Sequence, residues 1–345
     1  MIEARGLART FRSRGRTVEA VRGVDLNVAA GELVGFLGPN GAGKTTTLRM
    51  LTTLLRPTSG TATVGGCDLL ADPLGVRKQI GYVAQGGGSA PECRVIEEIE
   101  IQGRFYGMSK RDAHERGALL AEQLDVGGLE RRLVKTLSGG QQRRLDIALG
   151  LIHSPGLVFL DEPTTGLDPQ SRANLWEHIR ALRAEHGVTV FLTTHYLEEA
   201  DSLCDRILVI DNGRLVAEGT PDELKARVSG DGVSVGVPAA SVAVAAEIAA
   251  GITGAHEVST VDGSDGSTLQ AGLAEVRFRV PRGDTALPEL LRALDAKEIT
   301  MTSVQVHRPT LDDVFLTLTG RTLRDAETTP ETTETTETTG VPDGA

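Results

Sequence analysis

Residues 38–45 read Gly38-Pro39-Asn40-Gly41-Ala42-Gly43-Lys44-Thr45, which matches the pattern GxxxxGK[ST] of a phosphate-binding loop. The loop follows an apolar run, Leu33–Leu37, and opens a helical pattern, Thr46–Leu55, which is the strand–loop–helix setting that the pattern requires. Its glycines let the backbone wrap closely around a phosphate, and the amides at the start of the helix then point at the anion. We therefore predict that residues 38–45 and the adjacent Thr46 bind a nucleotide.

Two side chains of this loop are suited to the chemistry of a nucleoside triphosphate. Lys44 can reach the β- and γ-phosphates, and the hydroxyl of Thr45 can ligate Mg²⁺. The chain has only 6 Lys among its 345 residues. A chance match to the pattern is therefore expected at about 1% over the whole chain, before the surrounding strand and helix are considered.

A second motif ends another apolar run. The sequence Leu157-Val158-Phe159-Leu160-Asp161-Glu162-Pro163 reads as a buried strand with two acids at its end. Such a pair alone is usually part of a solvated loop, but beside a phosphate-binding loop a carboxylate in this place can hold Mg²⁺. We therefore expect Asp161 to bind the metal ion and Glu162 to accept a proton from the water that attacks the γ-phosphate.

A third motif precedes a long helical pattern, Gln142–Ile152. It reads Leu137-Ser138-Gly139-Gly140-Gln141, and Ser138 is a natural N-cap. Taken alone, this could be an ordinary helix start that contains glycine. Together with the two motifs above, the exposed amides of its glycines predict a second anion site.

Short apolar runs alternate with helical patterns over the first 220 residues, which predicts an α/β fold with a parallel sheet covered by helices. These runs are Leu33–Leu37, Val158–Leu160, Val188–Leu192 and Ile207–Ile210. Residues 231–320 read instead as β-α-β-β-α-β, the split-βαβ or ferredoxin-like order of a small α+β domain. Its expected elements are strand Val233–Val237, helix Ala239–Ala250, strand Glu257–Val261, turn Asp262–Ser267, strand Glu275–Val280, helix Leu287–Leu294 and strand Thr300–His307, followed by helix Leu311–Leu318.

Residues 321–345 are a low-complexity run of Thr and Glu, which predicts a disordered acidic tail. Six acidic and no basic residues lie between Asp325 and Ala345, so about half of the net charge of −11 belongs to residues 325–345. The rest of the chain is only mildly acidic and holds 7 Phe, 3 Tyr and 1 Trp. Neither a basic surface nor an aromatic platform is indicated, so we expect no nucleic-acid partner.

The longest apolar run, Ala239–Ile252, contains Ser241 and Glu247. It is shorter than the roughly 20 residues of a membrane-spanning helix, so we expect no membrane span in this chain. The N-terminus shows no apolar stretch typical of a secretory signal.

The motifs and their order resemble the ATP-binding subunits of ABC transporters over residues 1–220, and the resemblance implies an ATP-binding domain at residues 1–225. Residues 38–45 resemble the Walker A motif, residues 137–141 the ABC signature, and residues 157–163 the Walker B motif. The spacing between these motifs leaves room for the helical subdomain of that family at about residues 86–155. The resemblance implies a P-loop ATPase fold with a mixed sheet core, followed by the small C-terminal domain.

Three shorter motifs complete the resemblance. Gln85 follows the strand-like Ile80–Ala84 as in the Q-loop, Gly166-Leu167-Asp168 is similar to the D-loop, and Thr194-His195 to the switch histidine. Phe11 resembles the aromatic residue that stacks on adenine, with a place in the core as an equal alternative.

The resemblance implies a mechanism that the phosphate-binding loop alone does not. It implies ATP as substrate and Glu162 as base. It also implies Gln85 as a catalytic residue that binds Mg²⁺, with Thr45 and Asp161, and senses the attacking water. Two copies are expected to pack head to tail as a homodimer with two ATP molecules between them. The γ-phosphate held by Lys44 of one copy would then be contacted by the signature of the other copy, through Ser138 and the amide of Gly140, with Gly139 and Gln141. His195 is expected at the same phosphate, and Asp168 is expected near the nucleotide.

Within this family the sequence resembles the drug-exporter branch, in particular the daunorubicin-resistance ATP-binding proteins. The resemblance rests on Arg143-Arg144-Leu145-Asp146-Ile147-Ala148, on Gly103–Ser109, on Pro57 and on the ending Leu311–Gly320. It implies efflux of a drug or antibiotic through a separate integral membrane permease, with this chain peripheral at the cytoplasmic face of the cell membrane. One stretch departs from the family, because Gly86–Arg94 holds three glycines where an acidic and apolar segment is usual.

Other readings remain open on the sequence. An ABC system that moves lipid, polymer or another solute has the same motifs, and so does an importer subunit. A non-transport ABC ATPase acting on DNA or ribosomes is a further alternative, although only 51 residues separate Gln85 from Leu137 and no coiled-coil heptads occur there.

Overall fold

The computed structural model describes residues 1–13, 16–228, 230–262 and 272–320. These residues form two compact units, Met1–Val216 and Ala217–Gly320, each with its own hydrophobic core. The boundary falls inside strand β10 (Arg214–Gly219), somewhat earlier in the chain than the boundary expected near residues 225–231.

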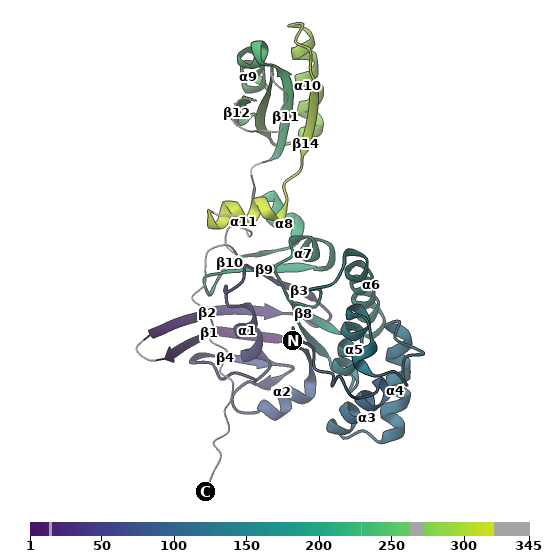
Figure 1. The fold of residues 1–345 in the computed structure, drawn as a ribbon. Coiled ribbons are helices and arrows are strands. Elements are labelled where there is room, and N and C mark those ends of the chain that lie inside the picture. The colour runs from purple at the N-terminus through teal and green to yellow at the C-terminus, as the bar shows by residue number, and fades with distance from the viewer. Residues whose placement is uncertain (14–15, 229, 263–271, 321–345) are drawn as a thin grey trace. The chain divides into compact units, whose positions relative to one another are not determined.

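The first unit is built around a six-stranded sheet with the order β10-β9-β3-β8-β7-β6 (Figure 1). The parallel sheet predicted from the sequence is confirmed: β3 runs parallel to β8 and β9, and β7 runs parallel to β6 and β8. Every residue of β3, β7 and β8 is buried, as expected for strands covered on both faces. The strands span β3 Leu33–Leu37, β6 Ile80–Val83, β7 Leu157–Asp161, β8 Thr189–Thr194 and β9 Arg206–Asp211.

The strands of a second sheet in this unit were not located from the sequence, although the resemblance implied a mixed sheet core. It is antiparallel with the order β2-β1-β4-β5, and it makes the sheet core mixed. Its core-facing residues, among them Ile2 and Val28, pack in the same cluster as Phe36 of β3. The strands span β1 Ile2–Ser13, β2 Arg16–Val28, β4 Ser59–Val64 and β5 Cys67–Asp68.

Helices surround these sheets. One of them ends earlier than the sequence predicts and another begins earlier, and each difference has a cause in the neighbouring residues. Helix α1 (Lys44–Leu51) ends before the expected Leu55, because Thr53 has a left-handed backbone with φ 63°. Helix α5 (Gly139–Leu151) begins three residues early, because Ser138 and Gln141 form a reciprocal capping box at its start. The other helices of the unit are α2 Pro73–Gln79, α3 Val95–Phe105, α4 Lys110–Gln123, α6 Pro169–His186 and α7 Leu197–Leu203.

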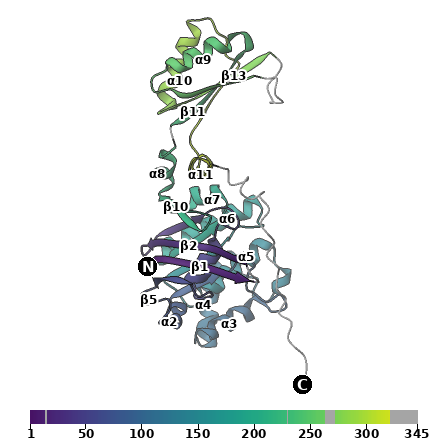
Figure 2. The ribbon, with the colours of Figure 1, turned by 90° about the vertical axis from the view of Figure 1, so that its left-hand side faces the viewer.

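The expected helical subdomain corresponds to α3, α4 and α5, which lie together on one side of the first unit (Figures 1 and 2). Helix α5 also packs closely against β6. A Cβ placed on Gly81 would lie 2.2 Å from the carbonyl oxygen of Gly150, so the backbones of the two elements touch. This contact fixes α5, which carries the signature at its start, against the edge of the central sheet.

The second unit contains the element order β-α-β-β-α-β that the sequence indicates. Its four strands form an antiparallel sheet with the order β12-β13-β11-β14. Apolar residues of α9 and α10 pack against β11 and β13 to form its core. The elements are α8 Pro221–Ala226, β11 Asp231–Pro238, α9 Val242–Gly251, β12 His256–Asp262, β13 Leu273–Val280, α10 Gly283–Asp295, β14 Ser303–His307 and α11 Leu311–Thr319.

Two sequence predictions fall outside the described residues. The turn expected at Asp262–Ser267 lies there except for its first residue, and the tail at residues 321–345 lies there entirely. None of the helices in the described part of the chain is both long and apolar enough to span a membrane.

Candidate active site

The phosphate-binding loop joins β3 to α1, as its sequence pattern requires. Gly43, which precedes α1, has φ 104°, and a Cβ there would lie 2.5 Å from the carbonyl oxygen of Ala20 in β2. A Cβ on Gly38 would lie 2.3 Å from the carbonyl oxygen of Ile210 in β9. Both positions therefore require glycine, and both neighbouring strands fix the shape of the loop.

Lys44 is the first residue of α1, and its side chain is buried. Its Nζ donates to the carbonyl oxygens of Gly38 at 2.7 Å and Pro39 at 3.1 Å, and lies 3.3 Å from Oε1 of Glu162. The ammonium group is thus held between the loop backbone and the acid that follows β7. This is a position from which it can interact with an anion bound by the loop.

Asp161 ends β7 and lies beside the start of α1. Its Oδ1 accepts a hydrogen bond from Oγ1 of Thr45 at 3.1 Å and another from Oγ1 of Thr193 at 2.7 Å. The carboxylate and the Thr45 hydroxyl are the hard oxygen donors that Mg²⁺ prefers. Among the described residues, no group of three or more His, Cys, Asp and Glu side chains could hold a metal ion.

Glu162 has an unusual backbone for its residue type. Its φ is 43°, in the left-handed region that is costly for residues with a Cβ. Its N–H donates to Oγ1 of Thr193 at 3.0 Å, which helps to hold this conformation. Strained backbone of this kind concentrates at functional sites.

The carboxylate of Glu162 is the point where the predicted catalytic residues meet. Its Oε2 accepts hydrogen bonds from Nε2 of Gln85 at 2.9 Å and Oγ1 of Thr165 at 3.1 Å, and it lies 3.2 Å from Nδ1 of His195. Burial alone would raise the pKa of this carboxyl. The interactions with His195 and Lys44 outweigh burial and lower the pKa of Glu162 to about 2.

The signature residues lie at the start of α5, away from these contacts. Oγ of Ser138 accepts from the N–H of Gln141, and the Gln141 side chain accepts from the N–H of Ser138. A Cβ on Gly140 would lie 3.2 Å from Oγ of Ser171, so the motif borders the start of α6. Ser138 and Gly139 are exposed. The contacts described for this motif join it to its own helix and to α6 rather than to residues 38–45.

Asp168 is the N-cap of α6. Its carboxylate accepts from N–H and Oγ of Ser171, at 2.9 and 2.6 Å, and these hydrogen bonds lower the pKa of Asp168. In the structure the carboxylate of Asp168 therefore caps the N-terminus of α6. The nucleotide contact expected from the sequence remains a prediction.

Phe11 lies on β1 opposite Val18 of β2. Its ring is 39% exposed, which argues against the core alternative, and the guanidinium of Arg9 stacks over one face at 4.7 Å. The same strand β2 carries Ala20, whose carbonyl borders Gly43 of the loop. An exposed aromatic ring on this hairpin is compatible with stacking on a base.

Sequence reasoning missed three residues that hold this site together. Thr193 bridges Asp161 and the backbone of Glu162, and Arg143 and Asp146 of α5 bond to the segments around Gln85 and Glu162. The only sequence signal for Thr193 was its place directly before Thr194-His195. Arg143 and Asp146 were noticed solely as part of a subclass resemblance.

Comparison with known proteins shows the family of this chain. The family model described as ABC transporter matches residues 21–165, and the model described as ATP-binding protein DrrA1-3-like, C-terminal domain, matches residues 219–319. The chain is similar to the daunorubicin resistance ATP-binding protein DrrA3 of Streptomyces coeruleorubidus, with 45% identity over 88% of this chain and 92% of that one. It is also 39% identical to the Nod factor export ATP-binding protein I of Burkholderia lata, over 88% and 93% of the two chains.

Among solved structures, a dimeric ATP-binding cassette in a post-hydrolysis state, bound to ADP and Pi, matches with a TM-score of 0.59 and 26% identity. The match covers 64% of this chain and 98% of the cassette. The chain belongs to the ATP-binding proteins of the ABC transporter family. Cassettes of this family bind ATP, and the protein is an ATPase, as the sequence resemblance implied.

Proposed function

We propose that this chain is the ATP-hydrolysing subunit of an exporter that removes a drug or antibiotic through a separate membrane permease. The observation that carries the catalytic part is the meeting of Lys44, Gln85 and His195 at the carboxylate of Glu162. The similarity to daunorubicin-resistance proteins over nearly the whole chain, including the C-terminal unit, supports the export of a drug.

In this proposal Glu162 is the general base. The lowered pKa keeps it ionised at neutral pH, and Gln85 and Thr165 orient its carboxylate. Binding of ATP draws the Lys44 ammonium toward the phosphates, which moves away a positive charge that lowers the pKa of Glu162 and so makes the carboxylate a better proton acceptor. Thr45 and Asp161 would hold Mg²⁺, which supplies charge neutralisation at the phosphates when it is bound.

We further propose that two copies pair head to tail. The exposure of Ser138 and Gly139 supports this arrangement, because the Ser138 hydroxyl and the amide of Gly139 can then donate to a phosphate bound by another copy. The dimeric cassette that matches the fold provides a second support. His195 would then contact the phosphate from the side of Glu162.

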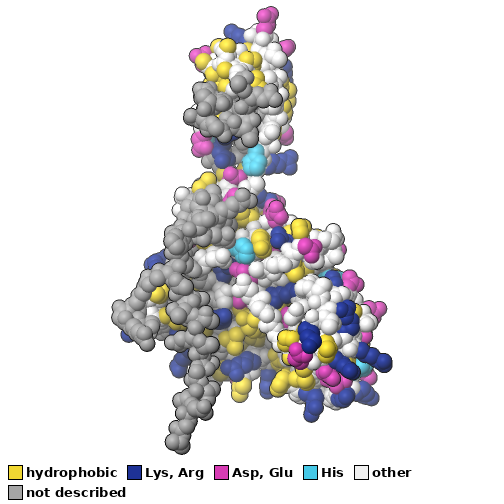
Figure 3. All heavy atoms as spheres, viewed as in Figure 1, with side chains coloured by type: hydrophobic (Ala, Val, Ile, Leu, Met, Phe, Trp, Pro, Cys, Tyr) yellow, Lys and Arg dark blue, Asp and Glu magenta, His cyan; other side chains and the backbone are white. Residues whose placement is uncertain are grey.

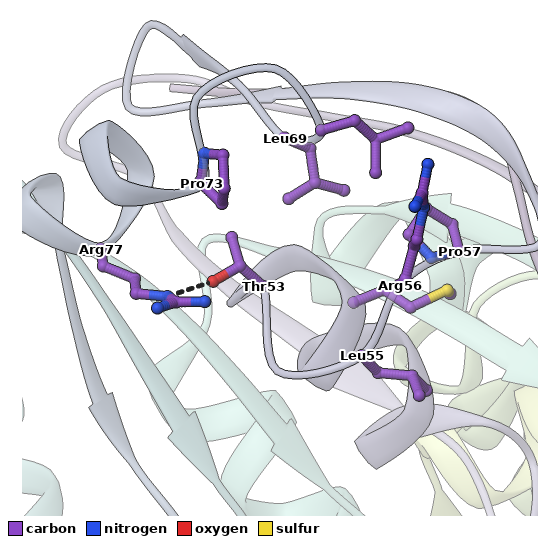
Figure 4. Close-up of a pocket in the computed structure, with 9 residues that line it drawn as sticks. Thr53, Leu55, Arg56, Pro57, Leu69, Pro73 and Arg77 are labelled. Atoms are coloured by element: carbon purple, nitrogen blue, oxygen red, sulfur yellow. Dashed lines mark hydrogen bonds between the residues drawn. The ribbon is translucent and has the colours of Figure 1, made fainter.

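A permease is proposed to dock on the end of the first unit where α2 and α3 lie. Figure 3 shows apolar side chains gathered over these elements, at the bottom of the view. A pocket of about 270 Å³ opens on this part of the unit, where apolar side chains surround Arg56 and Arg77 (Figure 4). The Nε of Arg77 donates to Oγ1 of Thr53 at 2.7 Å and so fixes the turn after α1. The large exposed apolar residues here are Leu54, Leu70, Leu74, Ile101, Phe105 and Tyr106.

Replacing Phe105 tests this docking face. Phe105 ends α3 and is 81% exposed, so Phe105→Glu should not disturb the fold. We expect the isolated subunit to hydrolyse ATP at the normal rate, while co-purification with the cognate permease falls at least about tenfold, because a charge must be desolvated in an apolar interface. Val244→Glu on α9, at a residue that is 42% exposed, is the control. Unchanged co-purification of the Phe105 variant would place the permease elsewhere.

The export proposal has its own experiment. The chain is expressed with its cognate permease in a drug-sensitive host, and tolerance and cellular accumulation are measured for a panel that includes daunorubicin. We expect higher tolerance and lower accumulation, both abolished by Glu162→Gln. An active ATPase complex that changes neither quantity for any drug would contradict drug export.

Movement of another solute is the second candidate. The observation that favours it is the 39% identity to the Nod factor export ATP-binding protein I of Burkholderia lata. Stimulation of the ATPase of the purified complex by a lipid or an oligosaccharide, and not by drugs, would favour it.

A further inference from the structure

Arg143 reaches both catalytic segments with one buried guanidinium. Its Nη1 donates to the carbonyl oxygen of Ala84 at 2.5 Å, directly before Gln85. Its Nη2 donates to the carbonyl oxygen of Asp161 and its Nε to that of Pro163, both at 2.9 Å, on the two sides of Glu162. The planar fork of arginine is suited to holding three carbonyls at fixed positions, whereas a lysine ammonium is not.

Asp146 holds the other side of the Gln85 segment. Its Oδ1 accepts from the N–H groups of Gly88 and Ser89, both at 3.2 Å. A Cβ on Gly87 would lie 2.7 Å from Oδ2 of Asp146, and Gly87 has φ 75°. The glycines of this stretch therefore allow the loop shape in which its amides reach the Asp146 carboxylate.

The two residues act from one face of one helix. Positions 143 and 146 are three apart in α5, so their side chains are neighbours, and both are 7% exposed. Burying a charge is costly unless it is hydrogen-bonded, and here each charge is satisfied by backbone groups of the catalytic segments. The helix that begins with the signature is in this way bonded to residues on both sides of Gln85 and of Glu162.

We propose that Arg143 and Asp146 are positioning residues for ATP hydrolysis, which keep Gln85 and Glu162 within hydrogen-bond distance and link that distance to the placement of α5. The proposal rests on the catalytic roles proposed for Gln85 and Glu162. A displacement of about 1 Å at such a pair can lower the rate about 100-fold without weakening the binding of substrate.

Single-residue variants of the full-length protein test the proposal. In Arg143→Lys the charge stays but the three carbonyls lose their common donor, and in Asp146→Ala the two amides lose their acceptor. We expect kcat to fall about 10- to 100-fold in each variant while KM and the Kd for ATP stay within about twofold. Asp146→Asn retains an acceptor oxygen and should recover most of kcat. In the slow variants, ATP should also prolong the life of the dimer seen by size-exclusion chromatography.

A matched control separates positioning from general stability. Arg183 also joins distant segments, since its Nε donates to the Gly31 carbonyl and its Nη1 to Asp205, both at 2.8 Å, but it does not bond to the segments around Gln85 or Glu162. Arg183→Lys should lower the Tm to a similar extent and leave kcat unchanged. The proposal is overturned if the folded Arg143 and Asp146 variants keep the normal kcat, or if kcat, ATP affinity and Tm fall together as in a partly unfolded protein.

Failure of the underlying catalytic assignment gives a different result. If Glu162→Gln hydrolyses ATP normally, the assignment of the base is wrong whatever the α5 variants do. If Glu162→Gln is inactive and the α5 variants are fully active, Glu162 is still assigned as the base, but the positioning role of Arg143 and Asp146 is contradicted. Should Arg143→Lys fail to fold, the comparison of Asp146→Ala with Asp146→Asn alone decides between the outcomes.

Discussion

Glu162→Gln should lower the turnover of ATP by at least about 100-fold, the usual contribution of a general base. Glutamine has the size of glutamate and keeps an oxygen that can accept from Gln85, but it cannot take the proton of the attacking water. Lys44 keeps its bonds to the carbonyls of Gly38 and Pro39, so ATP should still bind. Bound but unhydrolysed ATP should hold two copies together, which size-exclusion chromatography with ATP and Mg²⁺ would show as a stable dimer.

Glu198 provides the control for this variant. It lies on α7, three residues after His195, and is exposed. Glu198→Gln should release phosphate at the wild-type rate and should not accumulate the dimer. Phosphate release from Glu162→Gln at a rate close to that of the wild type would show that another group acts as the base.

Lys44→Ala should weaken the binding of ATP by about 100-fold or more. The variant removes a buried cation whose hydrogen bonds to charged phosphate oxygens are worth about 1.5–3 kcal/mol each, and about 1.4 kcal/mol corresponds to a tenfold change in Kd. It also removes the ammonium group that helps to lower the pKa of the Glu162 carboxyl, so this pKa should rise from about 2. Equilibrium binding of a fluorescent ATP analogue measures the loss.

Lys110 is the matched control for the loss of a lysine. It lies on α4, is 74% exposed, and within the described part of the chain it forms an ion pair with Glu100. Lys110→Ala should bind ATP as the wild type does. Tight binding of ATP by Lys44→Ala would contradict the assignment of residues 38–45 as the nucleotide site.

The motifs were predictable from the sequence because each is short and contiguous. The spacing in residues 38–45 is set by the geometry of one loop, and the two acids after β7 follow from a buried strand that must end in polar residues. Ser138 was also predictable, since an N-cap depends on its own neighbours along the chain.

The antiparallel sheet was missed because its strands lack a regular pattern. Arg5, Arg9 and Arg12 interrupt the apolar residues of β1, and register shifts occur in its pairing with both β2 and β4. A strand with such irregularities changes the face on which its apolar residues lie, so alternation cannot reveal it.

The residues that hold Asp161, Glu162 and the segment before Gln85 in place could not be predicted, for a different reason. Thr193 bonds to Asp161 from 32 positions away, and Arg143 reaches Ala84 from 59 positions away. Such contacts depend on how the strands are ordered in the sheet, and a single sequence carries no local sign of that order.

The left-handed backbone at Glu162 has a consequence for engineering this protein. Such a conformation costs of the order of 1–3 kcal/mol in a residue with a Cβ, and glycine adopts it without that penalty. A selection for heat resistance alone would therefore favour replacements at this position that relieve the backbone and abolish turnover. Thermostable descendants of this protein would then have to gain their folding free energy elsewhere, because the residue proposed as the general base occupies one of the positions with a left-handed backbone.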